Sequence, residues 1–245
     1  MASSAAEVPP APLAERIARH QRWTVAALAL VTVGAWAWFA TRPMMMMPSP
    51  PMTALMWFVM MAAMMLPSAA PAILLYGRVA ARHRGAVAPS WQFLAGYLLA
   101  WCGFSLVATA AQVAATRSGM LDPMSLRASA AVGAALWIAA GIYQLTPLKR
   151  ACLAQCRAPA PFFARRWRPG QAAAVRLGLA HGSFCIGCCG ALMALLFVGG
   201  AMNLAWAAAL AAVVAVEKIV PHGDRIGRAL GLAMIGWGGF VLLAL

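Results

Sequence analysis

Acidic residues are scarce in this chain, and charge of either sign is sparse. Only five Asp and Glu occur among 245 residues, and charged residues make up 10% of the sequence. A water-soluble domain of this size needs more polar surface than that. The sequence also contains no P-loop, G-x-S-x-G or H-E-x-x-H pattern, so nothing in it supports an NTPase, a serine hydrolase or a zinc metalloprotease. We therefore expect neither a soluble domain nor an enzyme.

Long apolar runs are what the sequence has instead, since 64% of its residues are hydrophobic and its mean hydropathy is +0.79. Runs of about 20 such residues are the length that crosses a bilayer as a helix. The sequence predicts an all-α membrane bundle of about seven transmembrane helices in a single domain, residues 23–245, after a tail at 1–22 without fixed structure. The predicted spans are 23–40, 53–76, 91–116, 128–145, 177–198, 202–220 and 226–245.

The basic residues predict how these spans are oriented. The net charge of +14 would suggest a nucleic-acid partner for a soluble protein, but here the 19 Lys and Arg lie between apolar runs, as topology signals do. Sixteen of them fall on one side of the seven-span arrangement, and only Arg42, Arg117 and Arg127 fall on the other. Cytoplasmic loops carry such an excess. We expect a cytoplasmic N-terminus, an external C-terminus, the lipid bilayer as a partner and no nucleic acid.

One predicted span carries an unusual group of soft ligands. Cys185, Cys188 and Cys189 fall within five residues, and His181 precedes them by one helical turn. At about 100° per residue, the four side chains occupy an arc of roughly 100° on one helix face. Packing is the alternative explanation, because buried cysteines often behave as small hydrophobic residues. We favour a metal or redox role, because three clustered cysteines with a histidine are harder to explain by packing.

Glycines on the same span predict close approach by its neighbours. Gly182, Gly187 and Gly190 lie among the cysteines, and small residues let membrane helices pack tightly. A site completed by other helices needs that approach. Cys102, near the middle of the predicted span 91–116, is an accessory candidate, although packing explains it better when it is considered alone.

A second cysteine pair, Cys152 and Cys156, lies in the longest predicted cytoplasmic loop. Their spacing brings both sulfurs to one side of a helical turn. They are either metal ligands, placed to receive or deliver an ion, or two free thiols on a basic helix. As ligands, they form either one site with Cys185, Cys188 and Cys189 or a second site. Structural disulfides are not expected, because the cytosol is reducing and no cysteine falls in an outward-facing predicted loop.

Methionine is abundant, with 16 copies. Its thioether is a soft neutral ligand suited to Cu(I), but it also fills irregular helix contacts. Met60 and Met64 share a face of the predicted span 53–76, and Met193 follows Cys189 by one turn, so these three are accessory ligand candidates. The methionine run at 44–47 is a further candidate on the outer side.

Two pairs of residues interrupt the apolar runs and are candidates for functional positions. Pro67 and Pro71 lie four residues apart in the predicted second span and are expected to bend it, as in the broken helices that border transport sites. Glu217 and Lys218 are an acid and a base near the cytoplasmic end of the predicted sixth span. Glu217 is an accessory candidate because intramembrane acids are often functional, and a snorkelled pair with Lys218 is an equally good interpretation.

Several motifs occur together in a recognisable order. They are Met60-Met-Ala-Ala-Met-Met-Leu-Pro67, Thr146-Pro-Leu-Lys149 with Cys152 and Cys156, residues 182–189, and Glu217-Lys218. In these motifs the chain resembles the bacterial domain-of-unknown-function family 2182 from roughly Pro50 to Leu245. The resemblance implies a metal-binding protein of the bacterial cytoplasmic (inner) membrane, and some members of that family are labelled copper chaperones. Gly190 departs from the bulkier residue expected there, which bears on the shape of the pocket.

Charge and softness together favour Cu(I) as the ion. An ion near the bilayer centre is costly unless its ligands neutralise it, and Cu(I) needs one thiolate where Zn²⁺ needs two. We predict Cu(I), with Zn²⁺ as the second choice, handled by a chaperone or transport component that exchanges it with a soluble or membrane partner. The alternative is a membrane thiol-redox protein that uses the C-x-x-C pair Cys185 and Cys188.

Overall fold

The computed structural model describes residues 13–41, 49–84 and 90–245. Within these segments the chain forms helices and no strand, and one isolated antiparallel bridge joins Leu121 to Ala128. The helices are α1 (Leu13–Thr41), α2 (Pro50–Arg84), α3 (Trp91–Arg117), α4 (Ala130–Leu145), α5 (Pro147–Arg157), α6 (Pro159–Arg166), α7 (Gln171–Ala194), α8 (Leu196–Gly199), α9 (Leu204–Ile219) and α10 (Gly223–Leu243). The methionine run at 44–47 lies outside the described residues.

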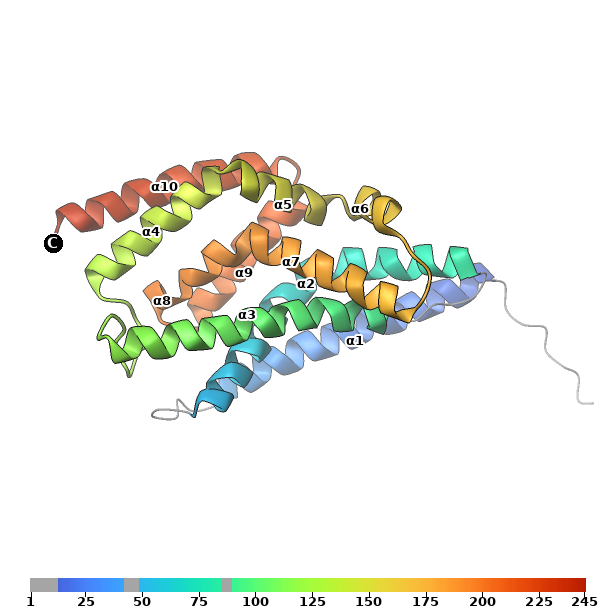
Figure 1. The fold of residues 1–245 in the computed structure, drawn as a ribbon, viewed down its shortest axis with the longest axis horizontal. Coiled ribbons are helices and arrows are strands. Elements are labelled where there is room, and N and C mark those ends of the chain that lie inside the picture. The colour runs from blue at the N-terminus through green and yellow to red at the C-terminus, as the bar shows by residue number, and fades with distance from the viewer. Residues whose placement is uncertain (1–12, 42–48, 85–89) are drawn as a thin grey trace, which may run out of the picture.

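The helices associate in pairs around α2 and α7. Helix α3 lies along α7, α4 lies along α10, and α1 rests on α2 (Figure 1). The short helices α5 and α6 continue from α4 and pass over α7, while α9 contacts both α2 and α10. Large side chains of α2 and α3, among them Trp57, Trp101 and Tyr97, fill the centre of the bundle.

Five described helices are long and apolar enough to cross a membrane, and a sixth span exists if α4 and α5, bent by 67°, are counted as one. The all-α fold is therefore confirmed for the described residues, with five or six helices that could cross a membrane, whereas the count of seven and the positions of the termini remain predictions. The difference arises from α4 and α9, which have 16 residues each. At 1.5 Å per residue each is about 24 Å long, which is shorter than a typical hydrocarbon core of about 30 Å.

The first helix begins earlier than the predicted span. It starts at Leu13 with Glu15 in its first turn, so residues 13–22, which the sequence analysis assigned to the tail, are helical. Leu, Ala, Glu and Arg dominate this stretch, and they are good helix formers. A carboxylate in the first turn also complements the helix dipole. Residues 1–12 lie outside the described part of the chain.

Capping residues set the bend that carries α5 over the bundle. Helix α4 ends at Leu145, and the Thr146 side chain then accepts a hydrogen bond from the Lys149 backbone N–H at 3.2 Å. Pro147 occupies the first turn of α5, where a missing N–H costs nothing. The chain therefore stops one helix and starts another within two residues. The 67° change of direction places the cysteine-bearing α5 against α7.

Glycines bring α7 into backbone contact with α3, and the sequence predicted the close approach of a neighbouring helix at Gly182, Gly187 and Gly190. A Cβ added at Gly178 would collide with the carbonyl oxygen of Phe93, and one at Gly182 would lie 2.6 Å from Cβ of Ala100. Gly190 differs, because a Cβ there would make only ordinary contacts, the nearest at 3.6 Å. The expected approach is therefore confirmed at Gly182 and is absent at Gly190. This contact fixes the depth and rotation of the helix that carries the cysteines.

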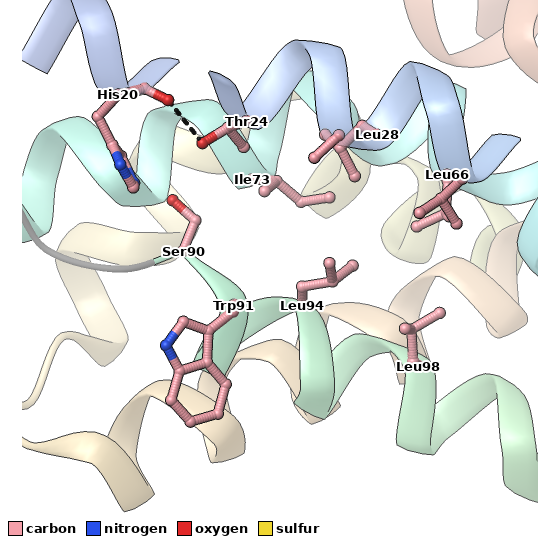
Figure 2. A pocket seen from close by; sticks show the side chains of 11 residues that line it. His20, Thr24, Leu28, Leu66, Ile73, Ser90, Trp91, Leu94 and Leu98 are labelled. Carbon is pink, nitrogen blue, oxygen red and sulfur yellow. Dashed lines mark hydrogen bonds between the residues drawn. The ribbon is translucent and has the colours of Figure 1, made fainter. Parts of the chain in front are cut away.

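An apolar cavity of about 270 Å³ separates α1 from α3. Leu66 and Leu98 lie at one end of it, and His20 and Ser90 lie at the other (Figure 2). The His20 Nε2 atom is buried and has no hydrogen-bond partner in the described structure. The residues that line this cavity include no cysteine, so it is separate from the cysteine-bearing face of α7.

Candidate metal centre

Three cysteines of α7 form a compact buried group. The Sγ atoms of Cys185, Cys188 and Cys189 all lie within 4.8 Å of one another. The Cys188 and Cys189 thiols both donate to the Cys185 carbonyl oxygen, at 3.1 and 2.9 Å. All three cysteines are free and buried. The helical arc inferred from sequence thus corresponds to sulfurs close enough together to share one ion.

A fourth sulfur comes from α5. The Cys156 Sγ lies 3.9 Å from the Cys188 Sγ, so the two cysteine motifs meet in space. Cys156 is only partly buried, in contrast to the three cysteines of α7. The four sulfurs, referred to below as the sulfur cluster (Cys156, Cys185, Cys188 and Cys189), therefore extend from a buried interior toward a more exposed edge. Such an arrangement permits an ion to pass between a surface thiol and buried ones.

The position of α5 depends on a buried ion pair. The Lys149 Nζ lies 2.6 Å from one carboxylate oxygen of Glu217, and the Gln144 side chain donates to the other oxygen at 2.6 Å. At the other end of α5, the Arg157 guanidinium donates to the carbonyl oxygens of Glu217 and Val220, each at 2.9 Å. These contacts hold both ends of α5 against the end of α9. The cysteines of α5 lie between them.

Lys218, the residue after Glu217, points to the sulfur cluster. Its Nζ lies 3.0 Å from the Cys185 Sγ and 3.1 Å from the Ser68 Oγ. An ion pair between Glu217 and Lys218 was one of two interpretations of the sequence, but in the structure the partner of Glu217 is Lys149. Consecutive residues of a helix point in directions about 100° apart. The acid therefore faces α5, while the base faces α7 and α2.

Helices α2 and α3 close the cluster from the remaining sides. The Met65 Sδ lies 3.7 Å from the Cys189 Sγ, and the Tyr97 hydroxyl lies 3.2 Å from the Cys185 Sγ. The Met65 carbonyl oxygen accepts hydrogen bonds from the Ser68 hydroxyl at 3.0 Å and from the Tyr97 hydroxyl at 3.4 Å. Helix α2 continues through Pro67 and Pro71. These two side-chain donors reach the backbone of α2 two residues before Pro67.

His181 lies one turn away from the cysteines in an aromatic enclosure. It is 3% exposed, and the rings of Phe93, Tyr97, Phe162 and Phe163 surround it with centroid separations of 5.6 to 6.5 Å. Its Nδ1 atom has no hydrogen-bond partner in the described structure. The compact group of three ligands within 4.8 Å does not include it. His181 therefore shares the helix face of the cysteines without joining their group.

The remaining predicted ligands are placed as follows. Cys152 is buried, and a Cβ added at Gly187 would lie 2.7 Å from its Sγ, so it packs beside the cysteine turn of α7. Met60, Met64 and Met193 are buried in the core, and no sulfur contact comparable to that of Met65 is found for them among the described residues. Both carboxylate oxygens of Glu217 are occupied by Lys149 and Gln144. Cys102 is partly buried in α3 and lies outside the compact ligand group.

A family model described as a copper chaperone, PpoB2, matches residues 54–241 of the chain. The chain belongs to the PpoB2 copper chaperone family. No curated protein and no solved structure matches it. Membership of the PpoB2 family confirms the resemblance inferred from the motifs. Together with the apolar helices and the three clustered cysteines, it fits a membrane protein that binds metal.

Sequence reasoning about this PpoB2 family member missed four residues that line the cluster. Met65 was not among the methionine candidates, which were Met60, Met64 and Met193. Tyr97, Ser68 and the inward direction of Lys218 were not anticipated either. One signal was present in the sequence. Lys149 and Lys218 are the only lysines among 19 basic residues, and both are buried. A lysine in a chain whose other cationic residues are all arginine indicates a special environment, because the two cations bind differently.

Proposed function

We propose that the protein binds Cu(I) in the sulfur cluster and handles it as a chaperone or transport component of the bacterial cytoplasmic membrane. The observation that carries the proposal is the meeting of four thiols from two helices with the Met65 thioether. Soft thiolate and thioether ligands select Cu(I), whereas carboxylates suit harder ions. Glu217, the acid next to the cluster-contacting Lys218, is already bound by Lys149 and Gln144.

The gradient of burial across the cluster supports handling of the ion rather than permanent storage. Cys156 is partly exposed, while Cys185, Cys188 and Cys189 are buried. An ion that arrives at Cys156 can exchange onto Cys188, whose sulfur is 3.9 Å away, without crossing an apolar gap. Cys152, and His181 with its unpartnered Nδ1, are assisting ligands in this proposal. The exchange partner is a soluble or membrane protein that presents Cu(I) on ligands of its own.

Metal analysis of purified protein tests the proposal. Wild-type protein, prepared anaerobically in detergent with a reductant, should retain Cu(I) in a stoichiometric amount. Replacing Cys185, Cys188 and Cys189 together by serine should abolish it. Cys102→Ser is the matched control, because that cysteine lies outside the ligand group. A triple variant that keeps its full copper content would refute the proposal.

The proposed orientation has seven spans, with the N-terminus and the basic loops in the cytoplasm. The excess of Lys and Arg in alternate loops supports it. Reporter fusions within residues 146–171 should report the cytoplasm, and a fusion after Leu245 should report the outside. A cytoplasmic C-terminus would mean that α4 or α9 does not cross the membrane, as their 16-residue length already allows.

Thiol redox chemistry is the second candidate, and one contact favours it. The ammonium group of Lys218 lies 3.0 Å from the Cys185 Sγ, and a neighbouring cation stabilises the thiolate that attacks disulfides. Cys185 also begins the C-x-x-C spacing with Cys188. If this candidate is correct, mild oxidation should produce a Cys185–Cys188 disulfide, detectable by mass spectrometry, and wild-type protein should not retain copper.

A further inference from the structure

Lys218 places a positive charge directly beside the sulfur cluster. Its Nζ is hydrogen-bonded to the Cys185 Sγ at 3.0 Å and to the Ser68 Oγ at 3.1 Å. The residue is 8% exposed, so water does little to screen that charge. The centre that receives the ion therefore already contains a cation.

No described acid compensates Lys218. Glu217 is bound by Lys149 and Gln144, which makes that group of side chains neutral without Lys218. The other described acids are Glu15 in α1, Asp122 in the α3–α4 connection, and Asp224, whose partner is Arg228. The counter-charge of Lys218 must therefore come from the cysteine sulfurs themselves.

We propose that Lys218 is a specificity-determining residue, whose fixed positive charge makes the centre select monovalent soft ions over divalent ones. This inference rests on the proposed function, because it concerns the same sulfurs. The Met65 thioether and the thiols already disfavour hard ions by their chemistry. Lys218 adds a separate criterion, which is the charge of the ion.

The charge criterion follows from elementary electrostatics. Repulsion between the ammonium group and a bound ion is proportional to the charge of the ion, so Zn²⁺ is repelled twice as strongly as Cu(I) at the same position. The requirement that the buried site carry no net charge also favours a monovalent ion over a divalent one. With Lys218 present, a monovalent ion needs two thiolates and a divalent ion needs three. A third thiolate among neighbouring sulfurs is costly, because like charges in a dry site repel strongly.

Affinities of Cu(I) and Zn²⁺ for the purified protein, measured by chelator competition under anaerobic reducing conditions, test the proposal. Lys218→Met and Lys218→Gln both remove the charge, and the glutamine keeps a hydrogen-bond donor. In both variants the ratio of the Zn²⁺ to the Cu(I) dissociation constant should fall by about tenfold or more. Lys218→Arg keeps the charge, so its ratio should stay close to that of the wild type.

The matched control is Arg225→Met, which removes a positive charge from an exposed position at the start of α10. Its ratio should not change. If the glutamine variant keeps the wild-type ratio and only the methionine variant shifts, Lys218 acts through its hydrogen bonds, and the charge proposal is overturned. Unchanged ratios in both neutral variants overturn it as well. Wild-type protein that binds neither ion would instead refute the proposed function.

A comparison on the wild type covers the case in which the neutral variants do not fold. Ag(I) and Cd²⁺ are both thiol-seeking ions but differ in charge. The protein should prefer Ag(I) over Cd²⁺ by a larger factor than a simple dithiol in solution does. An equal factor would overturn the role of Lys218, while leaving the binding of Cu(I) by the sulfur cluster intact.

Discussion

The two lysines of the chain are buried at the same end of α9 but in opposite surroundings. Lys149 faces the Glu217 carboxylate at 2.6 Å, and Gln144 occupies the second carboxylate oxygen. Lys218 faces the Cys185 thiol at 3.0 Å and a serine hydroxyl. The first group of side chains, Lys149, Glu217 and Gln144, is called the carboxylate side and has no net charge. The second, the sulfur side, has a cation and no acid. The comparison shows how one dipeptide, Glu217-Lys218, serves structure with one residue and ion binding with the other.

Removal of Lys149 should have the largest effect on stability. Lys149→Met leaves the Glu217 carboxylate buried without its cation, which costs about 3–5 kcal/mol of unfolding free energy. Lys218→Met leaves no buried carboxylate unpaired, because the sulfurs that face Lys218 can take up a proton in its absence, and it should cost about 1–2 kcal/mol from lost hydrogen bonds. Thermal unfolding midpoints in detergent, followed by tryptophan fluorescence, would rank the two variants. Equal losses would show that the two lysines do not differ in kind.

A double variant makes the same contrast sharper. Lys149→Met combined with Glu217→Gln removes both charges of the pair, and it should recover most of the stability lost in the single variant. Its copper content should remain below that of the wild type, because α5 then loses the charge pair that holds Cys156 near Cys188. Full copper retention would mean that the pair does not position the cluster.

The close approach of α3 to α7 stabilises the helix that carries Cys185, Cys188 and Cys189. Gly182→Val would place side-chain atoms against Ala100, where a Cβ alone would already lie 2.6 Å away. Overpacking of this kind costs about 1–3 kcal/mol. Gly190→Ala is the control, since its nearest neighbour would be 3.6 Å away and its midpoint should change little. A Gly182→Val midpoint equal to that of the control would contradict the packing described for α7.

Met65 tests which methionine takes part in binding. Met65→Leu conserves volume, so we expect a loss of less than about 1.5 kcal/mol of stability. It removes the thioether 3.7 Å from the Cys189 Sγ, and the affinity for Cu(I) should fall by a few-fold. Met60→Leu is the control, because Met60 is equally buried but has no described contact with a cluster sulfur. The account of Met65 fails if both substitutions weaken copper binding equally.

An exposed carboxyl should have the smallest effect. Hydrogen bonds from the Ser125 backbone N–H and hydroxyl, and from the Met124 N–H, lower the pKa of Asp122 from its ordinary value. The pKa of Asp122 is thus lower in the folded than in the unfolded protein. Its contribution to the free energy of unfolding is therefore present above the unfolded pKa of about 4 and is lost as the pH falls through the folded pKa. Unfolding midpoints of wild type and Asp122→Asn below pH 5 should show slightly less acid sensitivity in the variant. A steeper acid dependence of the variant would contradict this sign.

The features predicted from sequence are those set by residues close together along the chain. Apolar runs locate the helices, and the spacing of Cys185, Cys188 and Cys189 places three sulfurs on one face. Gly182 predicts the close approach of a neighbouring helix, without saying that this helix is α3. These features follow from the 3.6-residue repeat and from side-chain size.

The remaining features depend on how helices are placed relative to one another. The bend at Thr146–Pro147 brings Cys156 to Cys188 and Lys149 to Glu217, and no spacing along the chain encodes that pairing. Met65 was not a candidate because Met60 and Met64 were chosen from one face of the helix alone, whereas α1, α3 and α9 all pack against α2. The 16-residue lengths of α4 and α9 show why counting apolar runs did not settle the number of spans.

X-ray absorption at the copper edge tests the central claim most directly. Wild-type protein loaded anaerobically with one equivalent of Cu(I) should show a first shell of sulfur neighbours. The spectrum should change in Cys188→Ser and stay the same in Cys102→Ser. A shell dominated by nitrogen or oxygen, or a spectrum that the loss of Cys188 leaves unchanged, would show that copper binds elsewhere and would contradict a sulfur-cluster copper centre.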